Sequence, residues 1–179
     1  MRIIGGRLGG LRLNPPANLP VRPTTDIAKE ALFNILHNRL EFEGLGCLDL
    51  FAGTGNISFE LASRGAKAID AVDLHIRCVQ YIAETAKKME VQQINAKKAD
   101  VFKFISSCKS SYDLIFADPP YDIPKLPKLP ALIFERQLLN AGGLLIVEHP
   151  STRQMEAHPN FLETRKYGYS SFSFYVNPL

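Results

Sequence analysis

The sequence predicts an α/β fold, in which a mostly parallel seven-stranded sheet with an antiparallel edge strand carries helices on both faces. The first observation is that strand-like apolar runs alternate with helix-like segments from residue 48 to residue 148. Repeated β–α units of this kind place parallel strands beneath covering helices. The second is a glycine-rich turn, Gly53-Thr54-Gly55, which follows the first strand of the series. Because such turns hold ligands at the carboxyl ends of strands, we expect the functional site there.

Each element follows from its local pattern. Thr25 and Asp26 are good helix caps, and apolar residues near one face follow them as far as Leu40. The tail at 161–176 alternates serine with aromatic residues, which is typical of a half-buried strand in an antiparallel pair at the sheet edge. We expect the other strands at 48–52, 67–73, 94–99, 112–117 and 144–148, and the helices at 27–40, 56–64, 76–89, 101–108 and 130–140.

The chain divides into a basic N-terminal arm and linker, residues 1–23, and one domain, residues 24–179. Residues 2–13 place apolar residues around glycine pairs, which indicates a short hairpin whose backbone could approach a phosphate chain closely. A proline-rich linker follows. Residues 1–25 hold four arginines and no acid (+4), whereas the remainder holds 17 bases and 18 acids (−1). A basic arm on a neutral body favours a nucleic-acid partner, although a merely solvated basic N-terminus has the same composition.

Composition excludes several classes of protein. No apolar run approaches the roughly 20 residues that span a membrane, and the N-terminus lacks the apolar core of a signal peptide. Cys47, Cys78 and Cys108 are odd in number and have no partner at metal-ligand spacing, so we expect reduced, structural cysteines in a cytoplasmic protein without a metal site. The prolines at 124, 127 and 130 are spaced by three and predict an extended stretch.

Acidic residues lie at the ends of three successive predicted strands, around the glycine turn. Asp49 lies inside the first strand, Asp73 ends the second and Asp100 ends the third. A dinucleotide fingerprint requires glycine where this chain has Ser58, and a carboxylate in the first strand would repel a pyrophosphate. Carboxylates suit ribose hydroxyls, an adenine amine and the cationic end of an amino acid. The set therefore predicts S-adenosylmethionine as the cofactor, although each aspartate taken singly could be a helix cap.

The stretch Asp118-Pro119-Pro120-Tyr121 follows the predicted strand at 112–117. Two prolines end a strand, because proline fixes its φ and offers no N–H to a sheet. The resulting stiff turn displays a carboxylate, a carbonyl and an aromatic face. A planar base could stack on Tyr121 while its exocyclic amine donates to Asp118 and to the Pro119 carbonyl. A surface loop with one exposed tyrosine is the alternative.

Together these stretches resemble a Rossmann-like class I methyltransferase, and specifically the bacterial family that methylates guanine N2 in 16S ribosomal RNA. The resemblance runs along the whole chain. The matching stretches are 1–4, 22–26 (Arg-Pro-Thr-Thr-Asp), 30–36, 49–55, 63–66 (Ser-Arg-Gly-Ala), 118–121 and 166–168. The stretch 118–121 alone would also fit DNA adenine or cytosine amino methyltransferases.

The resemblance implies an enzyme that transfers methyl from S-adenosylmethionine to guanine in 16S ribosomal RNA or the assembling small subunit, leaving S-adenosylhomocysteine. We expect a monomer, although the sequence does not say whether the protein dimerises. It implies catalytic roles for Asp118, Pro119, Pro120 and Tyr121. The predicted cofactor-binding set is Asp49, Phe51, Ala52, Gly53, Thr54, Gly55, Asp73, Leu74, Asp100, Val101 and Asp118, and the predicted RNA-binding set is Arg2, Arg7, Arg12, Arg22 and Thr24. A DNA amino methyltransferase, a nucleotide-dependent oxidoreductase and a non-catalytic RNA-binding relic remain alternatives.

Overall fold

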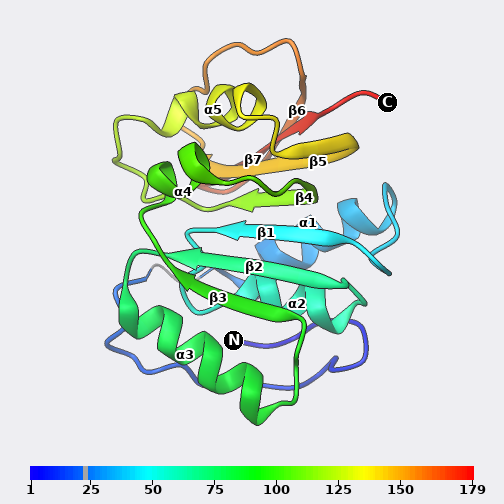
Figure 1. The fold of residues 1–179 in the computed structure, drawn as a ribbon, viewed down its shortest axis with the longest axis vertical. Helices are drawn as coiled ribbons and strands as arrows, with labels where there is room; N and C mark the ends of the chain where they lie inside the picture. The colour runs from blue at the N-terminus through cyan, green and yellow to red at the C-terminus, as the bar shows by residue number, and fades with distance from the viewer. Residues whose placement is uncertain (22–23) are drawn as a thin grey trace.

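The computed structural model describes residues 1–21 and 24–179, and a seven-stranded sheet forms its centre (Figure 1). The strands lie in the order β3-β2-β1-β4-β5-β7-β6. The predicted fold is confirmed: β1 to β5 run parallel to one another, and β7 is antiparallel to both of its neighbours. The strands are β1 Gly46–Leu50, β2 Ala68–Asp73, β3 Ile94–Lys98, β4 Tyr112–Ala117, β5 Leu139–Pro150, β6 Phe161–Tyr167 and β7 Ser170–Val176.

The strand that runs antiparallel to its neighbours, β7, was expected at the edge of the sheet and lies one position inside it. The chain passes from β5 to the outermost strand, β6, and turns back at Gly168, whose φ is +64°. The return strand, β7, then pairs with β5 over residues 144–150. The serine and aromatic alternation is thus that of a strand with a neighbour on each side.

Helices cover both faces of the sheet, and alternate residues of the strands contact them. Leu114 and Phe116 belong to one apolar core, which includes residues of α1, α2 and α3, whereas Ile115 and Ala117 belong to a second core with α4 and α5. The helices are α1 Asp26–His37, α2 Asn56–Ser63, α3 Ile76–Lys88, α4 Val101–Ser107 and α5 Leu129–Glu135. Within the described residues no helix is long and apolar enough to cross a membrane.

The boundary between α5 and β5 differs from the prediction of a helix at 130–140. The helix ends at Glu135, and Gln137 adopts a φ of +54° that leads the chain toward the sheet. Leu139 pairs with Tyr112, so the strand begins before the glycines that were expected to precede it. The proline-spaced stretch is not extended as expected, since residues 126–128 form a 3₁₀ turn that leads into α5.

The N-terminal arm folds back on itself as predicted, with an antiparallel bridge between Arg2 and Arg12. Its first glycine pair, Gly5 and Gly6, however, approaches the protein's own helix α2. A Cβ on Gly6 would lie 2.0 Å from the carbonyl oxygen of Ser63, and the Gly6 φ is +76°. Close internal packing therefore accounts for Gly6, whereas Gly10 has open space around it and the expected contact with a phosphate chain stays a prediction.

A buried ion pair fixes the arm to α1 and α2. The Lys29 Nζ lies 2.9 Å from the Glu60 Oε1, and both side chains are fully buried. The two carboxylate oxygens of Glu60 also accept the backbone N–H groups of Ile4 and Gly5, each at 2.8 Å. These bonds and the attraction of Lys29 hold the pKa of Glu60 below its usual value, against the effect of burial. These bonds hold the first residues of the arm against α1 and α2.

Candidate active site

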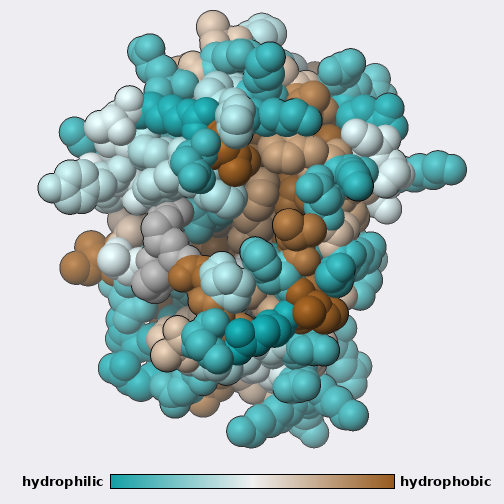
Figure 2. All heavy atoms as spheres, turned by 90° about the vertical axis from the view of Figure 1, so that its left-hand side faces the viewer, coloured by the Kyte–Doolittle hydropathy of each residue, from teal (hydrophilic) through white to brown (hydrophobic). Residues whose placement is uncertain are grey.

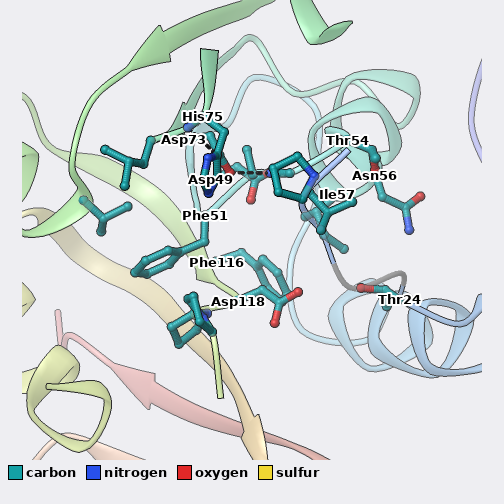
Figure 3. Close-up of a pocket in the computed structure, with 18 of the residues that line it drawn as sticks. Thr24, Asp49, Phe51, Thr54, Asn56, Ile57, Asp73, His75, Phe116 and Asp118 are labelled. Carbon is teal, nitrogen blue, oxygen red and sulfur yellow. Dashed lines mark hydrogen bonds between the residues drawn. The ribbon is translucent and has the colours of Figure 1, made fainter. Parts of the chain in front are cut away.

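A cavity of about 520 Å³ opens at the carboxyl ends of β1, β2 and β4 (Figure 3). It lies on the face shown in Figure 2, where apolar side chains surround a hollow. The structure brings together here nearly all of the predicted cofactor-binding and catalytic residues. Those that line it are Asp49, Phe51, Ala52, Gly53, Thr54, Asp73, Leu74, Asp100, Val101, Asp118, Pro119, Pro120 and Tyr121, with Thr24 of the predicted RNA-binding set.

Gly55 is the one residue of the predicted cofactor-binding set that does not line the cavity. It caps α2 with a φ of +79°, and a Cβ there would lie 3.0 Å from atoms of both Ile82 and Phe59. The glycine therefore allows α2 to lie close to its neighbours, while Gly53 faces the cavity.

Asp73 fixes the glycine turn to the end of β2. Its Oδ2 accepts the backbone N–H of Gly53 at 2.9 Å, and its Oδ1 accepts that of His75 at 2.9 Å. Each carboxylate oxygen keeps a further lone pair, because an ionised carboxylate has about four acceptor sites. Asp73 is therefore held in place and can still accept hydroxyl groups from a ligand in the cavity.

Asp49 lies beneath the same turn and is 1% exposed. The Ser58 hydroxyl donates to its Oδ2 at 2.6 Å. Burial raises the pKa of Asp49 to about 7, and the charge of Asp73 adds to the rise, although the bonds from Ser58 act against it. Ser58, which excluded a dinucleotide fingerprint, is thus the partner of the buried carboxyl. A cationic ligand group beside Asp49 would stabilise the ionised form.

The end of the cavity beside α4 is aromatic. Asp100 caps this helix by accepting the Lys103 N–H at 3.1 Å, and the rings of Phe51 and Phe102 meet edge to face with centroids 6.3 Å apart. The Lys125 ammonium lies 5.2 Å from the centroid of Phe102. A flat heterocycle with an amine could lie against these rings and donate to Asp100.

The turn at 118–121 is held at both ends. The Asp118 N–H donates to the Leu50 carbonyl at 3.2 Å, which ties the turn to β1. The Tyr121 hydroxyl bonds to Ser170 and donates to Glu148 Oε2 at 3.2 Å, and Arg153 donates to the Tyr121 carbonyl at 2.9 Å. Ring and backbone are therefore oriented before any ligand arrives.

The donor set fits the predicted cofactor. Asp49, Asp73, Asp100 and Asp118 all line the cavity, and among its described lining residues there is no lysine or arginine. Such a lining suits a ligand with hydroxyls, amines and a cationic end, and it does not suit a pyrophosphate. The residues present therefore fit S-adenosylmethionine.

Comparison with known proteins identifies the family. The chain matches the family described as "Conserved hypothetical protein 95" over residues 1–176. The chain belongs to this family. It is 33% identical to the "Putative rRNA methyltransferase YlbH" of Bacillus subtilis over 98% of each chain. It is 28% identical to the "Ribosomal RNA small subunit methyltransferase D" of Haemophilus influenzae, over 99% of this chain and 94% of that one.

A solved structure shows the same fold. The "Putative methyltransferase yhhF" of Escherichia coli superposes with a TM-score of 0.88 and 22% identity, and the match covers 100% of this chain and 98% of that one. The resemblance drawn from the sequence is confirmed, since this member of the conserved hypothetical protein 95 family is a homologue of the small-subunit rRNA methyltransferases. The prediction of a methyltransferase is confirmed with it.

The predicted RNA-binding residues that the structure describes lie partly at the cavity and partly in the N-terminal arm. Thr24 lines the cavity, whereas Arg7 bonds through its backbone to Ser63 at the end of α2 farther from the cavity. Arg2 and Arg12 form the bridge of the arm, with the Arg2 Nε 3.6 Å from a carboxylate oxygen of Asp26. Arg22 lies outside the described residues.

Sequence reasoning missed the residues that support the site. Glu148 and Ser170 hold the Tyr121 hydroxyl, and Asn56 lines the cavity from the first position of α2. A signal was present for Glu148, since it ends the strand predicted at 144–148. Glu148 is thus an acid at the end of a predicted strand, as Asp73 and Asp100 are.

Proposed function

We propose that the protein transfers a methyl group from S-adenosylmethionine to the exocyclic N2 amine of a guanine in 16S ribosomal RNA of the small subunit. One observation carries the proposal: the turn at 118–121 lines the same cavity as Asp49, Asp73 and Asp100. A site for an amine on a flat base thus adjoins a site for the cofactor. The small-subunit rRNA methyltransferases among the relatives and the resemblance in motifs support this substrate.

The cofactor-binding residues act along the carboxyl ends of three strands. Asp100 and Val101 would hold the adenine, Asp73 the ribose hydroxyls, and Asp49 with Gly53 the amino-acid end. When bound, S-adenosylmethionine supplies an electrophilic methyl group on a positively charged sulfur. Phe51 and Phe102, which line the cavity, would shield the adenine from water.

The turn holds the target base. Guanine N2 is a poor nucleophile, because its lone pair is delocalised into the ring. Accepting the two N2–H hydrogens at the Asp118 carboxylate and the Pro119 carbonyl favours a pyramidal nitrogen with its lone pair free to react. The base must leave its stack to reach the turn. Stacking on Tyr121 then contributes about 1–3 kcal/mol to holding it.

Positioning dominates the reaction. Displacement at a methyl group requires the nucleophile, carbon and leaving group to lie in line, and a rigid site supplies that alignment at little further cost in entropy. Glu148, Ser170 and Arg153 keep Tyr121 and its backbone fixed. As the new N–C bond forms, N2 becomes acidic, and the Asp118 carboxylate takes the proton it already holds in a hydrogen bond.

The test compares substrates and one variant. Purified protein is incubated with methyl-labelled S-adenosylmethionine and unmethylated small subunits, naked 16S rRNA or duplex DNA. Label in ribosomal RNA and none in DNA supports the proposal, and label in DNA alone overturns the substrate. Asp118→Ala should abolish turnover while S-adenosylhomocysteine binds nearly as before. Equal loss of turnover and binding would contradict the role given to Asp118.

A further inference from the structure

Asn56 stands out among the residues that line the cavity because its amide is held by a buried cation. It occupies the first position of α2, and its Oδ1 accepts from the Lys29 Nζ at 2.7 Å. Lys29 is 0% exposed and lies behind the cavity wall. Its two other bonds go to the Arg2 carbonyl at 2.8 Å and to the Glu60 Oε1 at 2.9 Å.

This bond fixes which end of the amide faces Lys29. An ammonium group has three donors and no acceptor, and the three partners of the Lys29 Nζ engage all of them. The amide oxygen must therefore bond to the lysine, which leaves the two hydrogens of the Asn56 Nδ2 for another partner. Figure 3 shows the side chain beside the cavity with its nitrogen on the side of Thr24. Within the described residues, no group accepts a hydrogen bond from this nitrogen.

Charge differs between the two sides of the cavity. Asp49 lies near the end of β1 and Asp73 ends β2, and Figure 3 shows both to the left of Asn56. Behind Asn56, Glu60 is paired with both Lys29 and Arg64, which leaves this cluster with a net charge of +1. A zwitterionic ligand end is therefore favoured with its ammonium toward the aspartates and its carboxylate toward Asn56.

We propose that the Asn56 Nδ2 donates a hydrogen bond to the carboxylate of the amino-acid end of S-adenosylmethionine, with Lys29 setting the orientation of the amide. The inference rests on the proposed function, because it assigns one contact within the same cofactor site. Asn56 thereby sets the direction in which the amino-acid end lies, and with it the direction of the sulfur.

One isosteric substitution separates this role from a structural one. Asn56→Asp keeps an acceptor for Lys29 and replaces the Nδ2 donor by a second carboxylate oxygen. Asn56→Ala removes both the acceptor for Lys29 and the Nδ2 donor. Asn34→Asp, on the exposed face of α1, makes the same chemical change away from the cavity. Calorimetry measures the binding of S-adenosylhomocysteine and of decarboxylated S-adenosylhomocysteine, which keeps the amine, and thermal unfolding checks each variant.

Asn56→Asp is expected to weaken S-adenosylhomocysteine binding at least tenfold, since a hydrogen bond to a charged group is lost and two carboxylates meet. Binding of the decarboxylated ligand should change less than twofold, and thermal unfolding should show that the variant is folded. Equal weakening for both ligands, or wild-type affinity for both, would overturn the inference and leave the proposed function standing. A wild-type protein that binds neither ligand would overturn both.

Discussion

Replacing Asp49 by asparagine should change how the stability of the protein depends on pH. The folded protein raises the pKa of Asp49 from 3.8 to about 7, chiefly through burial. Between these two values the folded chain keeps a proton that the unfolded chain has released. The free energy of unfolding therefore falls as pH rises through this window, by about 4 kcal/mol for a shift of about three pKa units. Asparagine has no proton to lose, so the variant lacks this fall.

The assay is urea unfolding of the wild type and of Asp49→Asn, from about pH 4 to about pH 8. The stability of the variant relative to the wild type should rise across this range, and most of the rise should come below pH 7. Asp122→Asn, at an exposed position, should give a curve parallel to the wild type. Parallel curves for Asp49→Asn as well would refute the reasoning, because they would show that Asp49 does not carry the extra proton.

The ionisation of Asp49 should also make ligand affinity depend on pH. S-adenosylhomocysteine carries an ammonium that an ionised Asp49 attracts, so its affinity for the wild type should increase as pH rises through about 7. Asp49→Asn should bind more weakly at pH 8, and its affinity should lack this dependence. At pH 8, Asp49→Asn would then be more stable than the wild type and would bind S-adenosylhomocysteine more weakly. A wild-type affinity that stays constant across this range would contradict the contact.

Three further substitutions test other parts of the structure. Glu60→Gln leaves a buried ammonium without its carboxylate and should cost about 3–5 kcal/mol in urea unfolding, whereas exposed Glu41→Gln should be near neutral. Gly6→Ala places a Cβ 2.0 Å from a carbonyl oxygen and should lower the free energy of unfolding by more than about 2 kcal/mol. Gly10→Ala, with open space around it, should lower it by about 1–2 kcal/mol because of its φ alone. Similar losses of stability in the two variants would exclude the close contact at Gly6. Tyr121→Leu should cost about 1–3 kcal/mol in kcat/KM for RNA and leave S-adenosylhomocysteine affinity intact, and a matching loss of that affinity would argue against stacking.

The elements and the cavity could be predicted because their signals are local. Apolar runs mark most of the strands. Asp73 ends β2 and Asp100 comes two residues after β3, so parallel order alone brings the two residues to one edge of the sheet. Asp118 follows the same rule. Ser58 was informative as a departure from the dinucleotide pattern, although its bond to Asp49 could not be foreseen.

Other features depend on partners far apart in the sequence. Lys29 and Glu60 are 31 residues apart on different helices, and an isolated lysine in a helix reads as solvent-exposed. The early start of β5 depends on Leu139 pairing with Tyr112, which no local pattern reveals. The glycine pair of the arm signalled a close approach, but the sequence does not say to which surface. The structure supplies α2 as the answer.

The proposed methylation of guanine N2 in small-subunit ribosomal RNA can be measured directly. The most direct measurement is mass spectrometry of nucleosides from unmethylated small subunits treated with the protein and S-adenosylmethionine. We expect N2-methylguanosine with the wild type and none with Asp118→Ala. A methyl group on another base, or equal N2-methylguanosine from the two proteins, would contradict the account.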